Sequence, residues 1–196
     1  MALSYDQLLQ LLRDNRSTRR FRHDIPVGAD ALRRFADATR YCASGRNLQP
    51  LKYILVDDPK LVDSIFPTLQ WAGYLTDWEG SAPDERPTAY AVQLIDTSLA
   101  DSILCDDGLQ LEAFTLAARA EGISSCIIKS FNIPRLSEIL SIRAHLKPHY
   151  VVALGVAAEE IRLEEIKDGD FKYWRSEDGV HHVPKRPLDE IIVGDK

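Results

Sequence analysis

The residues with the clearest chemical potential lie near the N-terminus. The segment Arg16-Ser17-Thr18-Arg19 places two guanidinium groups and two hydroxyls within four residues. A planar guanidinium binds a phosphate through two parallel, charge-assisted hydrogen bonds, so this segment could hold a phosphorylated ligand. If the backbone is extended here, Ser17 and Arg19 share one face. The alternative is a solvated basic stretch without a ligand.

Two more polar segments and a set of aromatic residues are candidates for ligand binding. The loop from Ser44 to Pro50 is rich in polar side chains, although its Asn and Pro could serve only to shape turns. The pair Lys185-Arg186 adds cations near the end of the chain, or is simply a soluble terminus. Three aromatics spaced i, i+3 and i+7 predict a helix over 68–78, with either a substrate-stacking or a core role; they are Trp71, Tyr74 and Trp78.

The sequence contains none of the common nucleotide-binding or nucleophile motifs. It has no Gly-x-Gly-x-x-Gly, no Gly-x-x-x-x-Gly-Lys-Ser/Thr and no Gly-x-Ser-x-Gly. Neither the adjacent His181 and His182 nor the pair His145 and His149, which Pro148 interrupts, forms a metal-ligand pattern, so we expect no metal. Three cysteines at long spacings favour a reducing cytoplasm over a disulfide framework.

The hydrophobic pattern predicts the elements that position these residues. Ser4 and Gln7 have the spacing of a capping box, ahead of a helix that ends near Asn15. Asp106 and Asp107 are typical of a helix N-terminus rather than of a catalytic pair. Further helices are expected over 29–41, 61–66, 105–121 and 134–140, and strands over 53–56, 89–95, 125–128 and 150–156.

Length, composition and charge restrict the class of protein. The chain has 196 residues, of which 45% are hydrophobic and 28% charged, as in an ordinary globular domain. No apolar run approaches the roughly 18 residues of a membrane helix, and the first 15 residues do not resemble a signal peptide. The net charge of −6 disfavours a nucleic-acid partner. We therefore expect a cytoplasmic protein that binds a small molecule and neither a membrane nor a nucleic acid.

Three segments, in this order and spacing, resemble the nitroreductase family. They are Arg16–Phe21, the Ser44–Pro50 loop one helix later, and Val183–Leu188 near the end. In that family an Arg-Ser-x-Arg segment and a Pro-Ser-x-x-Asn-x-Gln-Pro loop contact FMN. The resemblance implies an α+β fold with a central, mainly antiparallel sheet flanked by helices, and a C-terminal strand exchanged in a homodimer.

The resemblance also implies roles for individual residues. The phosphate and ribityl chain of FMN would be held by Arg16, Ser17, Arg19, Lys185 and Arg186. The flavin ring would be approached by Ile128, Lys129 and Ser130, and from the partner subunit by Ser44, Arg46, Asn47 and Gln49. The aromatics at 71, 74 and 78 are the candidates for substrate contact, and the flavin rather than a side chain would carry the chemistry.

The implied function is an FMN-dependent oxidoreductase. It would use NAD(P)H to reduce a nitroaromatic, a quinone or a similar flat acceptor by a ping-pong mechanism. Two alternatives remain open: an FMN enzyme of the same fold with a specialised reaction, such as dehydrogenation or dehalogenation, and a flavin-free ligand-binding or regulatory protein.

The C-terminal part of the chain is expected to serve the dimer. Residues 1–196 would form one FMN-binding domain, with 159–196 as an extension that packs on the partner subunit. Residues 159–179 are charged and are predicted to be irregular, whereas Leu188, Ile191, Ile192 and Val193 have the pattern of an apolar terminal strand. Such a strand must find a sheet edge, its own or that of a neighbour.

Overall fold

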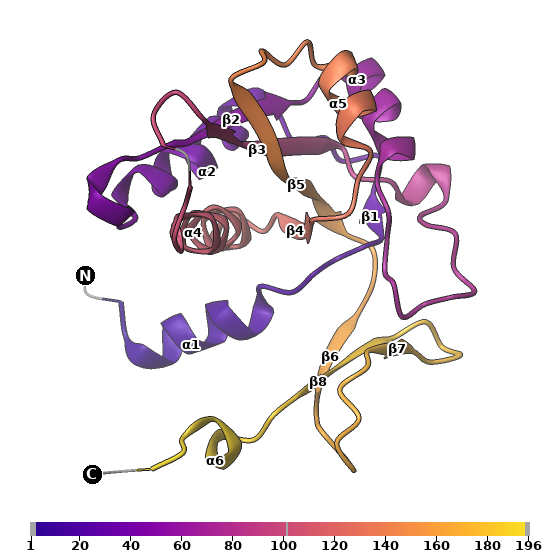
Figure 1. Cartoon of the computed structure of the whole chain (residues 1–196). Coiled ribbons are helices and arrows are strands. Elements are labelled where there is room, and N and C mark those ends of the chain that lie inside the picture. The colour runs from indigo at the N-terminus through magenta and orange to yellow at the C-terminus, as the bar shows by residue number, and fades with distance from the viewer. Residues whose placement is uncertain (1–2, 101, 195–196) are drawn as a thin grey trace.

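The centre of the main sheet is its longest strand, β5 (Leu146–Ala157). It pairs with β3 (Ala89–Asp96), with β4 (Ser124–Ile128) and with β1 (Phe21–Arg22), and β3 pairs with β2 (Leu51–Val56). Every one of these pairs is antiparallel, which confirms the predicted sheet type. The computed structural model, shown in Figure 1, describes residues 3–100 and 102–194.

Helices cover both faces of this sheet. On one face, α2 (Ala29–Ala38) and α4 (Asp106–Ala120) contribute Phe35 and Phe114 to a buried cluster. On the other face, α3 (Pro59–Ile65) and α5 (Ile133–Ile139) contribute Ile65 and Leu136 to a second cluster. Residues 151–154 of β5 have no exposed surface, because side chains on both faces are covered. This explains the unbroken apolar run that predicted the strand.

The helix boundaries follow from local chemistry. In front of α1 (Tyr5–Asp14), Ser4 and Gln7 form the predicted capping box, in which each side chain accepts a hydrogen bond from the other residue's backbone N–H. The Asn132 side chain caps α5 by accepting from the Arg135 N–H at 3.0 Å. After α4 the chain turns at Gly122, whose φ of +78° suits glycine. No helix in residues 3–100 and 102–194 is long and apolar enough to cross a membrane.

The segment after β5 leaves the main sheet, and we call residues 158–194 the arm and residues 3–157 the body. In the arm, β8 (His181–Lys185) pairs in parallel with β6 (Ile161–Glu165) and antiparallel with β7 (Trp174–Arg175). Figure 1 shows this small sheet below the body, on the side of α1. The prediction that 159–179 is irregular is therefore wrong in part, because two short strands lie within it. Their polar composition concealed them.

The predicted helix over 68–78 is wrong. After α3 the chain makes a 3₁₀ turn (Phe66–Thr68) and then a series of turns, with Ala72 at a φ of 41°. Without a helix, the three aromatics share no common face, and each has a partner of its own. Trp71 packs on Phe66, Tyr74 packs on Tyr173, and Trp78 lies under the Arg175 guanidinium. Tertiary contacts, rather than helical periodicity, explain their spacing.

The predicted terminal strand is also wrong within the single chain. Leu188–Ile191 form a short helix, α6, which begins after Pro187. An ion pair between Arg186 and Glu190, four residues apart, supports the helical turn. The apolar side chains of this segment are exposed, Val193 completely. The apolar pattern correctly indicates side chains that need to be covered, but it does not predict the conformation that they adopt.

Candidate functional site

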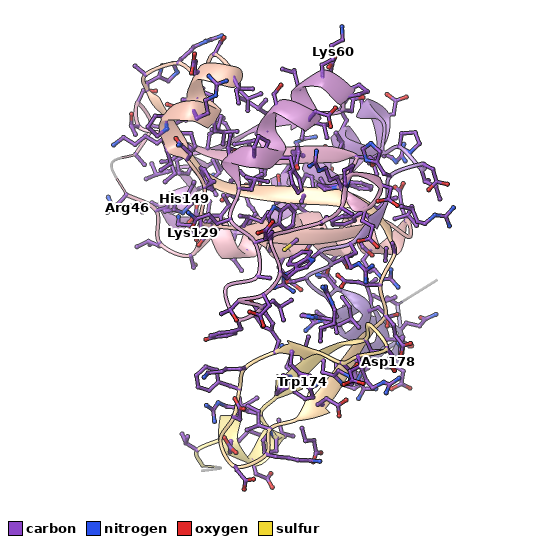
Figure 2. The ribbon with its side chains drawn as sticks, turned by 90° about the vertical axis from the view of Figure 1, so that its right-hand side faces the viewer. Arg46, Lys60, Lys129, His149, Trp174 and Asp178 are labelled. Atoms are coloured by element: carbon purple, nitrogen blue, oxygen red, sulfur yellow. The ribbon has the colours of Figure 1, made fainter. Side chains whose placement is uncertain are left out.

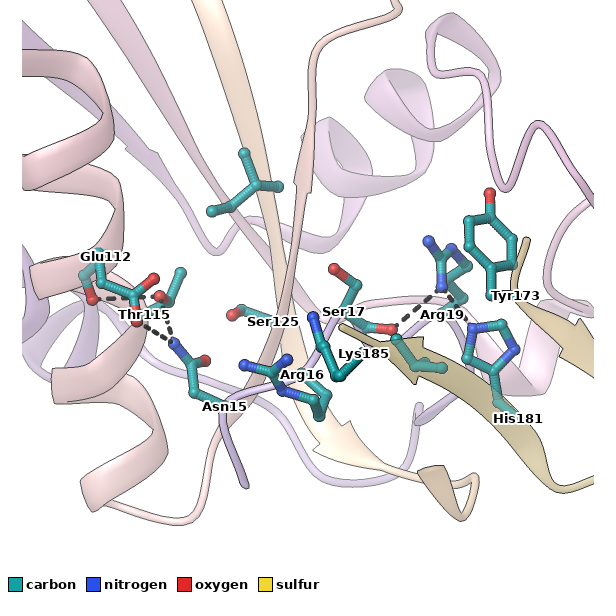
Figure 3. Close-up of a pocket in the computed structure, with 12 residues that line it drawn as sticks. Asn15, Arg16, Ser17, Arg19, Glu112, Thr115, Ser125, Tyr173, His181 and Lys185 are labelled. Carbon is teal, nitrogen blue, oxygen red and sulfur yellow. Dashed lines mark hydrogen bonds between the residues drawn. The ribbon is translucent and has the colours of Figure 1, made fainter. Parts of the chain in front are cut away.

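A cavity of about 300 Å³ lies where the end of α1, strand β4, helix α4 and the arm meet. Its lining side chains, drawn in Figure 3, are Asn15, Arg16, Ser17, Arg19, Glu112, Thr115, Ser125, Ile127, Tyr173, His181, Val183 and Lys185. The fold thus brings together Arg16, Ser17, Arg19 and Lys185, four of the residues selected from the sequence. Lys185 reaches this group from the arm, more than 160 residues further along the chain.

The N-terminal segment is attached to the sheet next to the cavity. Ser17 forms a bridge with Ser125 of β4, and the Thr18 N–H donates to the Ser125 carbonyl at 2.9 Å. Thr18 is buried, whereas Ser17 and Arg19 face the cavity, as expected for alternate residues of extended backbone. Asn15 donates from its side chain to Thr115 Oγ1 at 2.9 Å, which joins the end of α1 to α4.

The cavity is positively charged and incompletely hydrogen-bonded. Arg16 donates to the Leu12 carbonyl at 2.9 Å, but its buried Nε has no partner among the described residues. Burial, and then the charge of Arg16, lower the pKa of Lys185. Unpaired cations in a partly buried site are unfavourable unless an anion joins them. The donor set therefore fits a phosphate or another small anion.

Two residues of the arm, Tyr173 and His181, close one side of the cavity by contacting Arg19 of the body. The Nη1 of Arg19 lies 3.0 Å from His181 Nε2, and its guanidinium lies 4.7 Å from the centre of the Tyr173 ring. Burial, and then the charges of Arg19 and Arg175, lower the pKa of His181 to about 4. The imidazole is therefore neutral near pH 7, and its Nε2 can accept from Arg19.

A buried carboxylate holds the arm against the body behind this contact. The Glu159 side chain has no exposed surface; it accepts from the Arg20 N–H at 3.2 Å and pairs with Arg175 at 2.8 Å. It thereby connects the extended segment around Arg20 in the body to β7 of the arm. His181 and Lys185, which line the cavity, belong to the same arm that this connection holds against the body.

The loop 44–50 lies elsewhere in the single chain and does not line the cavity. Three of its residues, Arg46, Asn47 and Gln49, have φ values of 51°, 57° and 49°, in the left-handed region that side chains disfavour. Asp106 holds this shape: its buried carboxylate accepts from the Ser44 hydroxyl and, at 3.0 Å, from the Gly45 N–H. Backbone strain of this kind gathers at functional sites.

The segment after β4 is divided between the core and the surface. Ile128 points into the core cluster, whereas Ile127 lines the cavity. Lys129 lies 3.0 Å from His149 Nδ1, and the Ser130 hydroxyl donates to the Gln70 side chain at 2.6 Å. The side chain of Ile128 is therefore not available to a ligand in the cavity.

The other predicted site residues lie away from the cavity. Arg186 is paired with Glu190 at 2.6 Å and does not line the cavity. The aromatics at 71, 74 and 78 belong to the loop between α3 and β3 and do not line it either. Among the described residues, no group of three His, Cys, Asp or Glu side chains could hold a metal ion.

Several lining residues carried no signal that sequence reasoning could use. Tyr173 and His181 come from a part of the chain that has no motif, and they reach the cavity only because the arm folds back. Glu112 and Thr115 lie one turn apart on α4, and their spacing is what any helix face would show. Asp106 and Asp107 fit the expected helix N-terminus, yet each also accepts a hydrogen bond from another segment.

Comparison with known proteins agrees with this architecture. A family model described as the nitroreductase family matches residues 12–156. No curated protein matches the sequence. Among solved structures, a nitroreductase family protein from Streptococcus pneumoniae is 19% identical, with a TM-score of 0.67 over 96% of this chain and 100% of that one. One from Clostridium novyi is 20% identical, with a TM-score of 0.62 over 94% and 95%.

A third structure has a cofactor in its name. It is an FMN-dependent nitroreductase from Clostridium difficile, which is 19% identical, with a TM-score of 0.63 over 78% of this chain and 88% of that one. At these identities the solved structures establish the fold.

Proposed function

The chain belongs to the nitroreductase family of oxidoreductases, and from this premise we propose that it is an FMN-dependent enzyme that transfers electrons from NAD(P)H to a flat acceptor such as a nitroaromatic or a quinone. The observation that carries the proposal is the group of cations without carboxylate partners in the cavity: Arg16, Arg19 and Lys185. The FMN phosphate supplies the anion that such a group lacks. The FMN-dependent relative named above supports the same cofactor.

The residues at hand fit the cofactor in a specific way. Arg16, Ser17, Arg19 and Lys185 would hold its phosphate, and the backbone after Ile127 would approach its ring. Bound FMN would supply reversible two-electron chemistry, which no side chain of the protein provides. Arg186 receives no role here, because its guanidinium is engaged by Glu190.

The proposal includes a homodimer with two sites. Two apolar surfaces of the described chain support it: α1 buries none of its residues despite its row of leucines, and α6 exposes Leu188 and Ile191. Exposed apolar patches of this kind mark interaction surfaces. In the dimer, loop 44–50 of one subunit would complete the site of its partner, which gives its strained shape a purpose. The arm would pack against the partner subunit.

The cofactor assignment is tested by colour and by one substitution. The purified protein, or the protein reconstituted with FMN and freed of excess, should show flavin absorbance. Arg19→Ala should weaken FMN binding by about 2 kcal/mol, roughly 30-fold, because it removes one charge-assisted contact. Arg22→Ala is the matched control, since Arg22 lies in the same segment but pairs with Asp24 outside the cavity.

The outcomes separate clearly. A protein that stays colourless after reconstitution would exclude the proposed enzyme and favour a flavin-free ligand-binding protein. If Arg19→Ala bound FMN as tightly as the parent, FMN would have to lie elsewhere.

The electron transfer itself is tested by steady-state kinetics. If donor and acceptor occupy one site in turn, double-reciprocal plots at several acceptor concentrations should be parallel, as in a ping-pong mechanism. Intersecting lines with NAD(P)H and a quinone would instead indicate a ternary complex and a separate donor site.

A further inference from the structure

A chain of three titratable side chains lies outside the lining of the cavity and has no part in the phosphate site. His149 Nε2 lies 2.9 Å from Asp107 Oδ2, and His149 Nδ1 lies 3.0 Å from Lys129 Nζ. The ammonium of Lys129 also donates to the His149 carbonyl at 3.0 Å and lies 4.1 Å from the centre of the Tyr150 ring. Figure 2 shows Lys129 and His149 next to each other at the edge of the body.

A β-bulge aims His149 into this arrangement. Along β5, Tyr150 pairs with Gln93 and Pro148 pairs with Leu94, so His149 is an extra residue without an opposite on β3. Bulges of this kind turn a side chain to a new direction and are frequent next to functional sites. Here the extra residue brings the imidazole to Asp107 at the start of α4.

The partners determine what each group does. With Nε2–H donating to the Asp107 carboxylate, His149 keeps a lone pair on Nδ1 for the Lys129 ammonium. Burial alone would raise the pKa of Asp107, but the hydrogen bond from His149 lowers it below the usual range. The ammonium has three N–H groups, of which His149 occupies two, so one remains available to a ligand.

Lys129 directly follows β4, two residues beyond Ile127. Ser125 and Ile127 of β4 both line the cavity, whereas Cys126 and Ile128, which alternate with them, are buried in the core. Because alternate residues of extended backbone share a face, we expect Lys129 to continue the row of Ser125 and Ile127, roughly 7 Å beyond Ile127. If a ligand has its phosphate near Ser17 and Ser125 and extends along this row, its other end lies near Lys129.

We propose that Lys129 is a specificity-determining residue that selects flat acceptors carrying a carboxylate or a similar anionic oxygen, and that His149 and Asp107 are positioning residues that hold its ammonium in place. The inference rests on the proposed function, because it concerns the acceptor of that reaction. It adds the substrate class, which the family alone does not specify.

The test measures binding to the oxidised, FMN-loaded protein by calorimetry, with benzoate and benzamide as probes. The two rings have the same shape and differ in charge. The parent protein should prefer benzoate, and Lys129→Met should lower the ratio of benzoate to benzamide affinity about tenfold, the size expected for a charge-assisted hydrogen bond. Lys60→Met is the matched control, because Lys60 is exposed on α3 at the far end of the body in Figure 2.

Two further variants test the positioning role. Asp107→Asn keeps an oxygen that can accept from His149 and should retain most of the preference for benzoate. Asp107→Ala removes this acceptor and should lower the benzoate-to-benzamide ratio as Lys129→Met does. A residue needed only for folding would lower the affinity for both probes together.

Flavin absorbance is recorded on the same samples, so that two kinds of failure can be distinguished. A colourless parent protein overturns the proposed function and this inference with it. A yellow protein that shows no preference for benzoate, or one whose preference survives Lys129→Met, overturns this inference alone. The same comparison with 4-nitrobenzoate and 4-nitrobenzamide as acceptors, expressed as variant over parent, should give the same ratio in kcat/KM.

Discussion

The body and the arm both contain β-sheet, but they are stabilised in different ways. In the body, β5 buries residues 151–154 between two layers of helices. In the arm, the buried groups among residues 158–194 are Val180, His181 and the side chain of Glu159, and no large apolar side chain is fully buried there. The body can therefore fold on its own hydrophobic core, whereas the arm depends on a few polar contacts with the body and on whatever covers its apolar residues. The cavity lies at the junction of the two.

The strongest test of this contrast removes the end of the arm. Deleting residues 181–196 takes away β8, Lys185 and the apolar side chains of α6 together. We expect complete loss of FMN binding and of the dimer, because both are proposed to depend on these residues. The body should stay folded, because its two core clusters do not include this segment.

The deletion is measured by light scattering, flavin absorbance and thermal unfolding of the truncated chain. A truncated protein that remains dimeric and yellow would show that the arm is dispensable. Loss of the unfolding transition itself would show that the body is not independent.

A core substitution in the body should have the next largest effect. Phe114 is fully buried and packs on Phe35 and Tyr53, so Phe114→Ala should cost about 3–5 kcal/mol in the free energy of unfolding. Trp174→Ala is the comparison in the arm: Trp174 is exposed and stacks only on His182 in β8, so it should cost less than about 1 kcal/mol. Urea denaturation followed by circular dichroism measures both. Equal costs would contradict the contrast between the two regions.

A glycine in β5 offers a test by overpacking. A methyl group on Gly155 would lie 2.9 Å from Cδ1 and 3.0 Å from Cβ of buried Phe21, so Gly155→Ala should destabilise the protein by about 1–3 kcal/mol. The control is Gly108→Ala in the first turn of α4, where nothing lies within 4 Å of the added methyl. That change should instead stabilise the protein by roughly 0.5–1 kcal/mol. If the two variants had equal melting temperatures, the close packing of β1 on β5 would be in question.

Acid should loosen the arm before the body. The pKa of His181 is about 4 in the folded protein, below its ordinary value of 6.5, so the released arm binds the proton more readily. The docking of the arm is therefore fully stabilised above about pH 6.5 and weakens as the pH falls toward 4. Limited proteolysis of the arm across this range measures the effect. His181→Gln, which can still accept from Arg19 but does not titrate, should remove this part of the pH dependence.

The sequence predicted the body well because its signals are local. The capping box at Ser4, the asparagine cap of α5 and the apolar run in β5 each lie within a few neighbouring residues, and each is confirmed. The arm was predicted poorly for the opposite reason. Its strands lack an apolar pattern, and the contact of Arg19 with His181 joins residues 162 positions apart, which no local pattern reveals.

The site shows the same division. Arg16, Ser17, Arg19 and Lys185 were selected from the sequence and meet in one cavity. Arg186 does not line it, because one position further along the chain its side chain pairs with Glu190 instead. The three aromatics at 71, 74 and 78 have helical spacing in the sequence, but they do not lie on a helix. An Ala72-Gly73 turn, with a positive φ at Ala72, separates the first two.

The bulge at His149 suggests a simple route by which a family could gain or lose the residue that positions Lys129. Without His149, Tyr150 and Pro148 would become consecutive and would still oppose Gln93 and Leu94, so no pair between β3 and β5 would change. Gaining or losing this residue is therefore a single-codon event that leaves the sheet intact. Homologous chains can differ in length by one residue here, and an aligned gap at this position would mark members that lack the imidazole support for Lys129. Substrate range could thus diverge through an insertion inside a central strand, where insertions are normally excluded.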